Sequence, residues 1–385
     1  MNILLSIHHY MDKNAGAPGV TYRLAEEYRQ LGHNVELFSF DELPKDLPES
    51  LTTLLYPQYL HARCRKLERE GRLDVIDASS GDIWFHLRMR QRGGDTVAVT
   101  RSHGLEHMAH EARVERARLG EMKLSWKYPI YHGGYRLWEV AQSFRQADGA
   151  VLLNKDEYRY AADRFGLHHS RVIGNGVPDY LLDLPLAPTP LQEDTPVGIA
   201  FIGSYIPRKG TEFAAKGLAP VLERYPNAEV TFLGTQCPPE KVHADYDSRF
   251  HSRIHVVPRY EHSALPELLA GHQILLFPSL SEGMPLSLLE AMACGLAPVA
   301  SLIPGPNDII SHMDNGLGVP ARDGAAISEA LGTLLENREL LHRLRARAWE
   351  KAQDYSWRRI AEDTLAYYEH CAERKADSAK LRSIG

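Results

Sequence analysis

The chain has 385 residues, of which 44% are hydrophobic and 24% charged, and its formal net charge is −6. This length allows two or three domains with sizeable cores, and the composition is that of a folded globular protein. A negative net charge argues against a general nucleic-acid-binding protein, so we expect no nucleic-acid partner.

The first half of the chain alternates short apolar runs with longer amphipathic segments. The first apolar run, at 2–7, is followed by a segment of helical periodicity that ends at Gly32. Strands are predicted at the runs that share this apolar character: 2–7, 34–40, 75–79, 96–100, 149–153 and 171–174. Strands that are apolar on both faces and separated by helices are typical of a parallel sheet covered on both sides.

A stretch with five prolines, at 178–196, separates this half from a second alternating region and is interpreted as a linker. The later strands are predicted at 197–203, 229–234, 253–257, 273–277 and 297–300. Helices are predicted around 211–224, 238–248, 264–270 and 286–294, and almost throughout 324–373. We therefore predict an α/β protein with two Rossmann-like, doubly wound domains, at 1–180 and 190–355. Their ligand is expected in the cleft between them, at the carboxyl ends of strands.

Two acidic residues stand out in the otherwise apolar or small stretch SEGMPLSLLEAMACG (281–295). The chain turns after the strand at 273–277 and begins a helix near Pro285, whose missing N–H is tolerated in a first turn. A helix that starts at the carboxyl end of a strand offers N–H groups and a partial positive charge to an anion. The residues alone therefore indicate an anion site flanked by Glu282 and Glu290. The alternative is that Glu282 caps backbone amides and Glu290 extends into solvent.

The same region, PSLSEGMPLSLLEAMACGLAPVAS, closely resembles the E-x7-E signature of retaining glycosyltransferases of the GT-B architecture, family 4. The resemblance implies that Glu282 contacts hydroxyls of the donor sugar and that Glu290 binds the ribose hydroxyls of the nucleotide. A carboxylate can accept hydrogen bonds from both hydroxyls of a diol, which agrees with these roles. A last helix, at 356–385, is expected to cross back onto the first domain. The backbone expected to face the sugar and diphosphate belongs to Gly283, Met284, Pro285 and Leu286.

A second match, FIGSYIPRKG (201–210), resembles the strand and loop with which the family binds the diphosphate. Lys209 stands where the family has its lysine, but Ser204 replaces the usual arginine. Two alternatives stay open for Arg208: it supplies the missing charge, or it is a solvated surface residue. In this fold the base is recognised around the strand end at 256–260, which includes Arg259.

The first half carries weaker matches. The segment AGAPGVTYRLAEEYRQLGHNVELF resembles the family's glycine-rich first turn, with Gly16 in place of the second glycine of the usual pair. A simple tight turn is the alternative. The segment VTRSHGLEH (99–107) resembles the H-G-x-E strand end that places a histidine, here His103, in the catalytic centre. Asn154 and Glu157 occupy a corresponding strand end. No H-E-x-x-H motif is formed, so we expect no metal site.

The resemblance implies a metal-independent retaining glycosyltransferase that needs no cofactor. It would move a sugar from a nucleotide-diphosphate sugar to a hydroxyl of a saccharide, a lipid-linked molecule or a small molecule, with His103, Lys209 and Glu282 as catalytic residues. Retention is expected through entry of the acceptor on the leaving-group face, with Glu282 as a nucleophile as the alternative. A nucleotide-sugar 2-epimerase of the same fold and a non-catalytic sugar-nucleotide-binding subunit stay open, and Ser204 favours the latter.

The cellular location is predicted from cysteines and apolar runs. The four cysteines form no C-x-x-C pair, which favours a reducing, cytoplasmic compartment. A signal peptide is not expected, and no run of eighteen apolar residues is present to span a membrane. The segment RVERARLGEMKLSWK (113–127) is most simply a solvated helix. The alternative is that it contacts an acceptor or a membrane surface, which would make the protein peripheral at the inner membrane face.

Overall fold

The computed structural model describes residues 1–13, 16–90, 94–167, 169–187 and 195–384. The chain forms two compact units, and the first is assembled from both ends of the sequence. Unit 1 comprises Met1–Asn175 and Trp357–Gly385, and unit 2 comprises Gly176–Ser356. Part of the predicted linker, residues 188–194, lies outside the described residues. Within the described ranges, none of the helices combines the length and apolar character needed to cross a bilayer.

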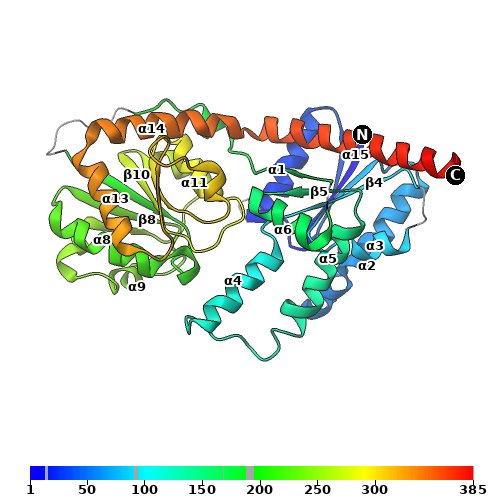
Figure 1. Ribbon diagram of the computed structural model, residues 1–385, viewed down its shortest axis with the longest axis horizontal. Helices are drawn as coiled ribbons and strands as arrows, with labels where there is room; N and C mark the ends of the chain where they lie inside the picture. Colours follow the sequence, from blue (N-terminus) through cyan, green and yellow to red (C-terminus); the bar gives the residue numbers. More distant parts are fainter. Residues whose placement is uncertain (14–15, 91–93, 168, 188–194, 385) are drawn as a thin grey trace. The chain divides into compact units, whose positions relative to one another are not determined.

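Unit 1 contains a parallel six-stranded sheet in the order β2-β1-β3-β4-β5-β6 (Figure 1). Its strands are β1 (Asn2–Ser6), β2 (Asn34–Phe38), β3 (Val75–Ser79), β4 (Val97–Arg101), β5 (Gly149–Leu152) and β6 (Ser170–Val172). Its α-helices are α1 (Gly16–Gln30), α2 (Glu49–Arg69), α3 (Trp84–Met89), α4 (Glu106–Arg118), α5 (Arg136–Gln146), α6 (Lys155–Phe165) and α15 (Trp357–Ile384). All six strands match the predicted runs.

Both faces of the unit 1 sheet are covered by helices, and alternate residues of β3 show why. Ile76 and Ala78 belong to the apolar cluster that includes Tyr56 of α2. Asp77 points to the opposite face, where Tyr368 of α15 donates a hydrogen bond to it. Successive side chains of a strand point to opposite faces, so a strand covered on both sides is buried along its whole length.

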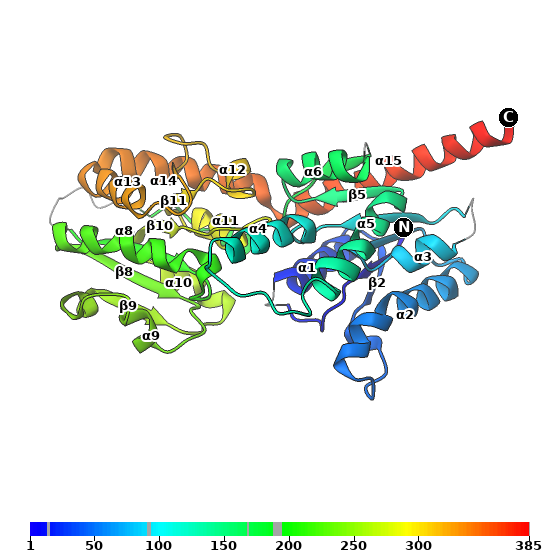
Figure 2. The ribbon, with the colours of Figure 1, turned by 60° about the horizontal axis from the view of Figure 1, so that its bottom comes forward.

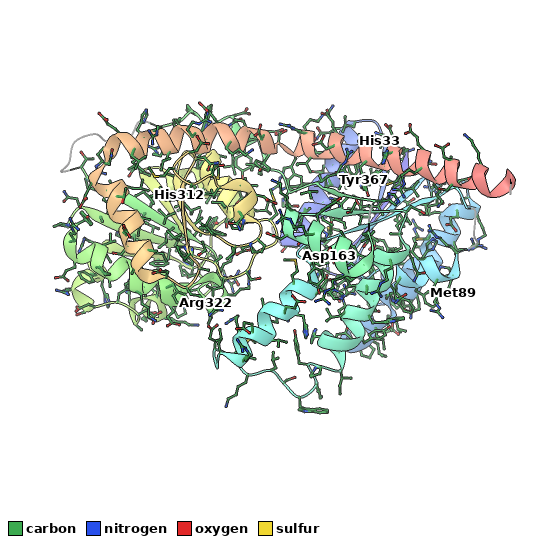
Figure 3. The ribbon with its side chains drawn as sticks, viewed as in Figure 1. His33, Met89, Asp163, His312, Arg322 and Tyr367 are labelled. Atoms are coloured by element: carbon green, nitrogen blue, oxygen red, sulfur yellow. The ribbon has the colours of Figure 1, made fainter. Side chains whose placement is uncertain are left out.

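Helix α15 completes unit 1 from the far end of the sequence. It lies against α1 and β4 (Figures 1 and 2). Tyr367 of this helix, labelled in Figure 3, accepts a hydrogen bond from the Ala150 N–H and donates one to the His169 carbonyl. The carboxyl-terminal helix is therefore bonded to β5, as the predicted return to the first domain requires.

Unit 2 contains a second parallel six-stranded sheet, in the order β12-β11-β10-β7-β8-β9. Its strands are β7 (Val197–Ile202), β8 (Ala228–Leu233), β9 (Ile254–Val257), β10 (His272–Phe277), β11 (Ala297–Ser301) and β12 (Leu317–Val319). Its α-helices are α7 (Asp179–Leu182), α8 (Thr211–Arg224), α9 (Pro239–His243), α10 (Leu265–Leu269), α11 (Leu286–Ala293), α12 (Pro306–Ile309), α13 (Gly324–Glu336) and α14 (Arg338–Ala352). Ile199 and Phe201 enter one apolar cluster and Ala200 and Ile202 the other, so both faces are packed.

Several details differ from the predicted elements: the short helices α7 and α12 were not predicted, and three further differences follow. Strand β12 was not predicted, because it has only three residues and one of them is Gly318. The helix predicted at 238–248 ends at His243, and a 3₁₀ turn capped by Asp247 follows. The helix predicted through 113–127 ends at Arg118, because the chain reverses at Gly120, which has a φ of +77°.

Candidate functional site

In unit 2 the strand order changes direction between β7 and β10. After β7 the chain adds β8 and β9 on one side of the sheet. After β10 it adds β11 and β12 on the other side. In open α/β sheets, ligands bind outside the carboxyl ends of the strands at this position. The two loops that start there are 203–210, after β7, and 278–285, after β10. They contain most of the predicted donor-site residues.

Lys209 joins these two loops. Its Nζ donates a hydrogen bond of 2.7 Å to Oε1 of Glu282 and lies 5.4 Å from the centre of the Phe277 ring. Its aliphatic chain crosses Gly203, where a Cβ would lie 3.3 Å from the lysine Cε. Gly203 has a φ of +138°, which glycine adopts without strain. The family lysine and the first glutamate are therefore brought together at one point.

Arg208 contacts the same loop as Lys209. Its Nη1 donates to the Ser281 carbonyl at 2.8 Å and lies 3.4 Å from Oε1 of Glu282. The guanidinium thus lies beside Glu282 rather than extending alone into solvent. Ser204, where the family has arginine, is half-buried and accepts a backbone hydrogen bond from Ile206 through its carbonyl. Phosphate binding by Arg208 and Ser204 stays a prediction.

Gly210 allows the two loops to approach closely. Its φ is +72°, and a Cβ there would lie 1.9 Å from the Pro278 carbonyl oxygen. The Leu280 N–H also donates to the Arg208 carbonyl at 2.9 Å. A side chain at position 210 would separate the loops, so the Lys209–Glu282 contact depends on this glycine.

Glu290, on α11, is held by a residue that the sequence did not reveal. Oε1 of Glu290 lies 2.9 Å from Nε2 of His262, and Nδ1 of His262 lies 2.6 Å from the Tyr180 hydroxyl. Glu290 is 8% exposed, so the alternative in which it extends into solvent is wrong. His262 follows the predicted base-recognition segment 256–260, but nothing in its local sequence indicates a partner 28 residues away.

Helix α11 is fixed at both ends. Pro285, predicted in the first helical turn, is instead the N-cap residue, one position before the first helical residue, and is buried. A Cβ at Gly305 would lie 2.3 Å from the Gly283 carbonyl oxygen, so the loop before the helix is also closely packed. At the other end, Nε of the buried Arg345 donates to the Gly295 carbonyl at 2.6 Å, and burial lowers the pKa of Arg345 to about 10.

The backbone atoms predicted to face the donor lie directly before and at the start of α11. Met284 packs against the unit 2 core, and Leu286 begins the helix. Arg259, after β9, is exposed, and its contact with a base stays a prediction.

In unit 1, polar groups gather at the carboxyl ends of β1, β3 and β4. His103 follows β4 and lines a small cavity with Asp77 and Arg101. Burial, and then the charge of Arg101, lowers the pKa of His103 to about 3, so its imidazole is neutral at physiological pH. Its role in the catalytic centre stays a prediction.

A second group at this edge was not predicted, and we call it the His8 cluster: His8, Asp82, Glu106, Arg136 and Glu139. Nδ1 of His8 lies 2.7 Å from Oδ1 of Asp82, and Nη2 of Arg136 lies 3.1 Å from Nε2 of His8. Arg136 is also 3.4 Å from Glu106 and 3.4 Å from Glu139. One cation therefore serves several carboxylates in a largely buried place.

Burial dominates the ionisation of the His8 cluster. Asp82 is 1% exposed, and neither of its carboxylate oxygens receives a hydrogen bond of good geometry among the described residues. Burial raises the pKa of Asp82 to about 7, against the opposing effect of Arg136. Burial, reinforced by Arg136, lowers the pKa of His8 to about 3.

Other residues singled out in the first half have local structural roles or open surroundings. Asn154 caps α6 by accepting from the Glu157 N–H, and the Glu157 carboxylate accepts from the N–H groups of Leu153 and Leu105. Gly16 is exposed at the start of α1, and a Cβ there would meet nothing within 4 Å. Gly19 is the tightly packed glycine of this turn, with a Cβ position 2.8 Å from the Lys13 carbonyl oxygen.

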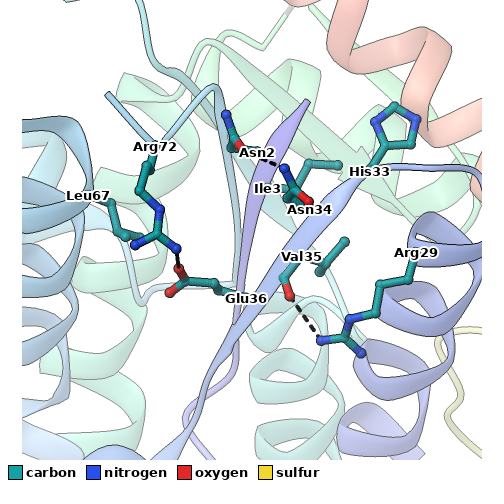
Figure 4. A pocket seen from close by; sticks show the side chains of 9 residues that line it. All are labelled: Asn2, Ile3, Arg29, His33, Asn34, Val35, Glu36, Leu67 and Arg72. Carbon is teal, nitrogen blue, oxygen red and sulfur yellow. Dashed lines mark hydrogen bonds and ion pairs between the residues drawn. The ribbon is translucent and has the colours of Figure 1, made fainter. Parts of the chain in front are cut away.

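A pocket of about 470 Å³ lies at the opposite edge of the unit 1 sheet, near the amino ends of β1 and β2 (Figure 4). Its charged groups are largely engaged with each other or with the backbone. Arg72 pairs with Glu36 at 3.1 Å, and Arg29 donates to the Val35 carbonyl at 3.0 Å. Because ligands of such sheets bind at the carboxyl ends, we assign this pocket no part in the reaction.

Across the described part of the chain, no group of three or more His, Cys, Asp or Glu side chains is arranged to hold a metal ion.

Comparison with known proteins agrees with this geometry. The family model described as Glycosyltransferase Family 4 matches residues 15–179, and the one described as Glycosyl transferases group 1 matches residues 196–337. A D-inositol 3-phosphate glycosyltransferase of Nocardia farcinica is 27% identical over 385 aligned positions, which cover 94% of this chain and 78% of that protein. Sucrose-phosphate synthase 4 of Arabidopsis thaliana is 36% identical over 106 residues, but these are 28% of this chain and only 10% of the plant protein.

Solved structures show the same fold. The sucrose-phosphate synthase of Thermosynechococcus elongatus aligns with a TM-score of 0.75 at 18% identity, covering 96% of this chain and 99% of that one. The Anabaena protein HepE in complex with UDP aligns with a TM-score of 0.67 at 17% identity, covering 96% and 100%. The two-unit α/β architecture is thus the GT-B fold. The chain belongs to the glycosyltransferases, with a Glycosyltransferase Family 4 region followed by a Glycosyl transferases group 1 region.

Proposed function

We propose that this glycosyltransferase binds a nucleoside-diphosphate sugar at the loops after β7 and β10 and transfers the sugar, with retention and without a metal ion, to a hydroxyl acceptor. The observation that carries the proposal is the convergence of Lys209, Arg208 and Glu282 beside the start of α11. Two cations and a helix N-terminus suit a diphosphate. The related fold of HepE in complex with UDP supports a nucleotide ligand.

Glu282 and Glu290 would hold different parts of the donor. Glu282 lies with Lys209 in the loop before α11, where a sugar hydroxyl could replace part of the ion pair as a hydrogen-bond partner. Glu290 lies within the helix, and His262 fixes the orientation of its carboxylate. The carboxylate would then accept hydrogen bonds from the ribose diol. The acceptor would be a saccharide, a lipid-linked molecule or a small molecule, bound by unit 1 near His103.

The chemical step follows from these roles. The bond between the anomeric carbon and the diphosphate oxygen breaks through an oxocarbenium-like state. Negative charge then grows on the diphosphate, where Lys209, Arg208 and the α11 amides would stabilise it in place of a metal ion. The acceptor oxygen attacks from the same face, and its proton passes to a diphosphate oxygen, so the configuration is retained. Glu282 acts as a hydrogen-bond acceptor for the sugar and not as a nucleophile.

The experiment is a panel of UDP-, GDP- and ADP-sugars in which nucleotide release is followed with and without EDTA. We expect turnover of at least one donor in the presence of EDTA. Lys209→Ala should lower kcat by roughly 10²–10³, the usual effect of removing one group that stabilises developing charge. Lys216→Ala is the matched control, because Lys216 is an exposed lysine of unit 2 that pairs only with Glu212 among the ion pairs of the described residues.

Several outcomes would contradict the proposal. Binding of none of the nucleotide sugars would remove the donor site altogether. Tight binding without turnover would favour a non-catalytic subunit, and conversion of the donor without any acceptor would favour an epimerase. Loss of activity in EDTA that Mg²⁺ restores would refute metal independence. A glycosyl adduct trapped on Glu282 would refute its role as a hydrogen-bond acceptor.

A further inference from the structure

The segment between α4 and α5 exposes large apolar side chains that the proposed reaction does not use. Trp126 is 77% exposed, Ile130 66% and Leu119 53%. None of the residues of α4, which leads into this segment, is buried. In Figure 1 the segment extends beyond the sheet and the other helices of unit 1. Clustered exposure of this kind usually marks an interaction surface.

The exposed residues are held outward by a buried neighbour. Tyr128 is 8% exposed, and its ring stacks on that of His110 at 5.6 Å with an interplanar angle of 8°. The Tyr128 hydroxyl lies 3.1 Å from Nδ1 of His110, and a Cβ at Gly133 would lie 3.0 Å from that histidine ring. Tyr128 is therefore anchored, while Trp126 and Ile130, two residues before and after it, are exposed.

Residues 119–130 carry two lysines and one glutamate, a net charge of +1, and the end of α4 directly before them adds three arginines and one glutamate. Residues 113–130 contain five basic and two acidic residues, a net charge of +3, whereas the whole chain has −6. Both glutamates pair within 113–130: Glu115 with Arg118 at 2.9 Å, and Glu121 with Arg116 at 3.2 Å. Lys123 and Lys127 are exposed, and Nζ of Lys127 lies 5.5 Å from the centre of the Trp126 ring. The positive charge thus lies beside the exposed apolar side chains.

We propose that the 119–130 segment docks on the headgroup region of a lipid bilayer that contains anionic lipids. Tryptophan prefers the boundary between headgroups and acyl chains, because its ring is apolar and its N–H is polar. Lysines beside it attract anionic headgroups.

The test uses the full-length protein and co-sedimentation with phosphatidylcholine vesicles, with and without phosphatidylglycerol. We expect binding to the anionic vesicles that weakens with added salt. Trp126→Ala, and separately Lys123→Glu with Lys127→Glu, should each lower the partition coefficient by roughly tenfold or more. Met89→Ala and Lys45→Glu are matched controls in unit 1, because both side chains are exposed and lie outside the segment.

The outcomes separate this proposal from the donor chemistry. Equal sedimentation of wild type and Trp126→Ala, or equal binding to neutral and anionic vesicles, would overturn the proposal. A change in oligomeric state of Trp126→Ala without vesicles would show that the segment binds a second copy of the chain, which would also overturn it. Nucleotide binding is measured on the same proteins, and we expect it to be unchanged. A loss of vesicle binding with intact nucleotide binding therefore concerns this surface alone.

Discussion

Glu282 and Glu290 have different partners, which makes their contributions separable by substitution. Glu282 is bound by cations of the loop after β7, whereas Glu290 contacts His262, which in turn contacts Tyr180. His262 acts through Glu290 and is therefore a positioning residue. Its effect should appear in donor binding before it appears in the rate of the chemical step.

We expect His262→Ala to raise the KM for the donor by roughly 5–30-fold, about 1–2 kcal/mol, because Glu290 loses a fixed hydrogen bond. The value of kcat should change less. His262→Gln should restore part of the affinity, since an amide can still donate to the carboxylate. His255→Ala is the control, because His255 is an exposed histidine of the same unit. Equal KM values for His262→Ala and wild type would show that His262 does not position Glu290.

Asp82 gives the stability of unit 1 a dependence on pH. Its pKa is about 7 in the folded protein against an ordinary 3.8, so between about pH 4 and pH 7 the folded state retains a proton that the unfolded state has lost. Stability from this group therefore falls as the pH rises through that window and is lowest above pH 7. His8, whose pKa is lowered from 6.5 to about 3, has the opposite slope between about pH 3 and pH 6.5.

Asp82→Asn removes the acid without much change in shape. We expect the variant to be more stable than wild type at pH 8, by roughly 2–4 kcal/mol, and by clearly less at pH 5. Chemical denaturation at the two pH values measures this difference. Asp163→Asn is the control, because Asp163 is exposed on α6 (Figure 3). A gain of the same size at both pH values would show that the pKa of Asp82 is not raised into the range between them.

At the scale of elements, the close approach of the loops after β7 and β10 depends on Gly210. Gly210 and Gly271 both have positive φ values, +72° and +90°. A Cβ at Gly210 would strike the Pro278 carbonyl oxygen, whereas one at Gly271 would meet nothing within 4 Å. Comparing alanine substitutions at Gly210 and Gly271 therefore separates two losses of folding free energy: one from the left-handed backbone and one from moving the loops apart.

We expect Gly271→Ala to cost about 1 kcal/mol of stability, from the backbone alone. Gly210→Ala should cost roughly 1–3 kcal/mol more, because the loops must separate. It should also lower nucleotide affinity, since Lys209 and Glu282 move apart. Thermal unfolding and nucleotide titration measure the two effects. If both variants behaved alike, the close contact with Pro278 would have no energetic weight.

The elements that the sequence predicted best are the buried strands, because their burial shows directly as a short run of apolar residues. Strands such as β3 and β7 are apolar on both faces, so five or six residues identify them. The contact between Lys209 and Glu282 joins residues 73 positions apart, and local pattern carries no signal for such a distance. The E-x7-E resemblance supplied Glu282 and the match at 201–210 supplied Lys209, but neither resemblance gave their pairing or His262. The His8 cluster was missed because its members come from four separate elements and loops.

At the scale of the whole molecule, unit 1 depends on a helix that the chain supplies last. Tyr368 of α15 donates to Asp77 on β3, and Arg101 of β4 donates to the same carboxylate at 2.6 Å and 2.9 Å. The Tyr368 hydroxyl also lies 3.2 Å from that of Tyr28 on α1. This buried network joins both ends of the sequence, and no residue of unit 2 belongs to it.

Tyr368→Phe should therefore destabilise unit 1 and leave the donor site unchanged. We expect a loss of roughly 1–3 kcal/mol, because Asp77 stays buried with one donor fewer. Nucleotide affinity, a property of unit 2 in our proposal, should stay within about twofold of wild type, since a tenfold change would require about 1.4 kcal/mol of coupling. Tyr225→Phe is the matched control, because that hydroxyl donates to the exposed Glu336. Loss of nucleotide binding under conditions where Tyr368→Phe is fully folded would show that α15 transmits strain from unit 1 to the donor site.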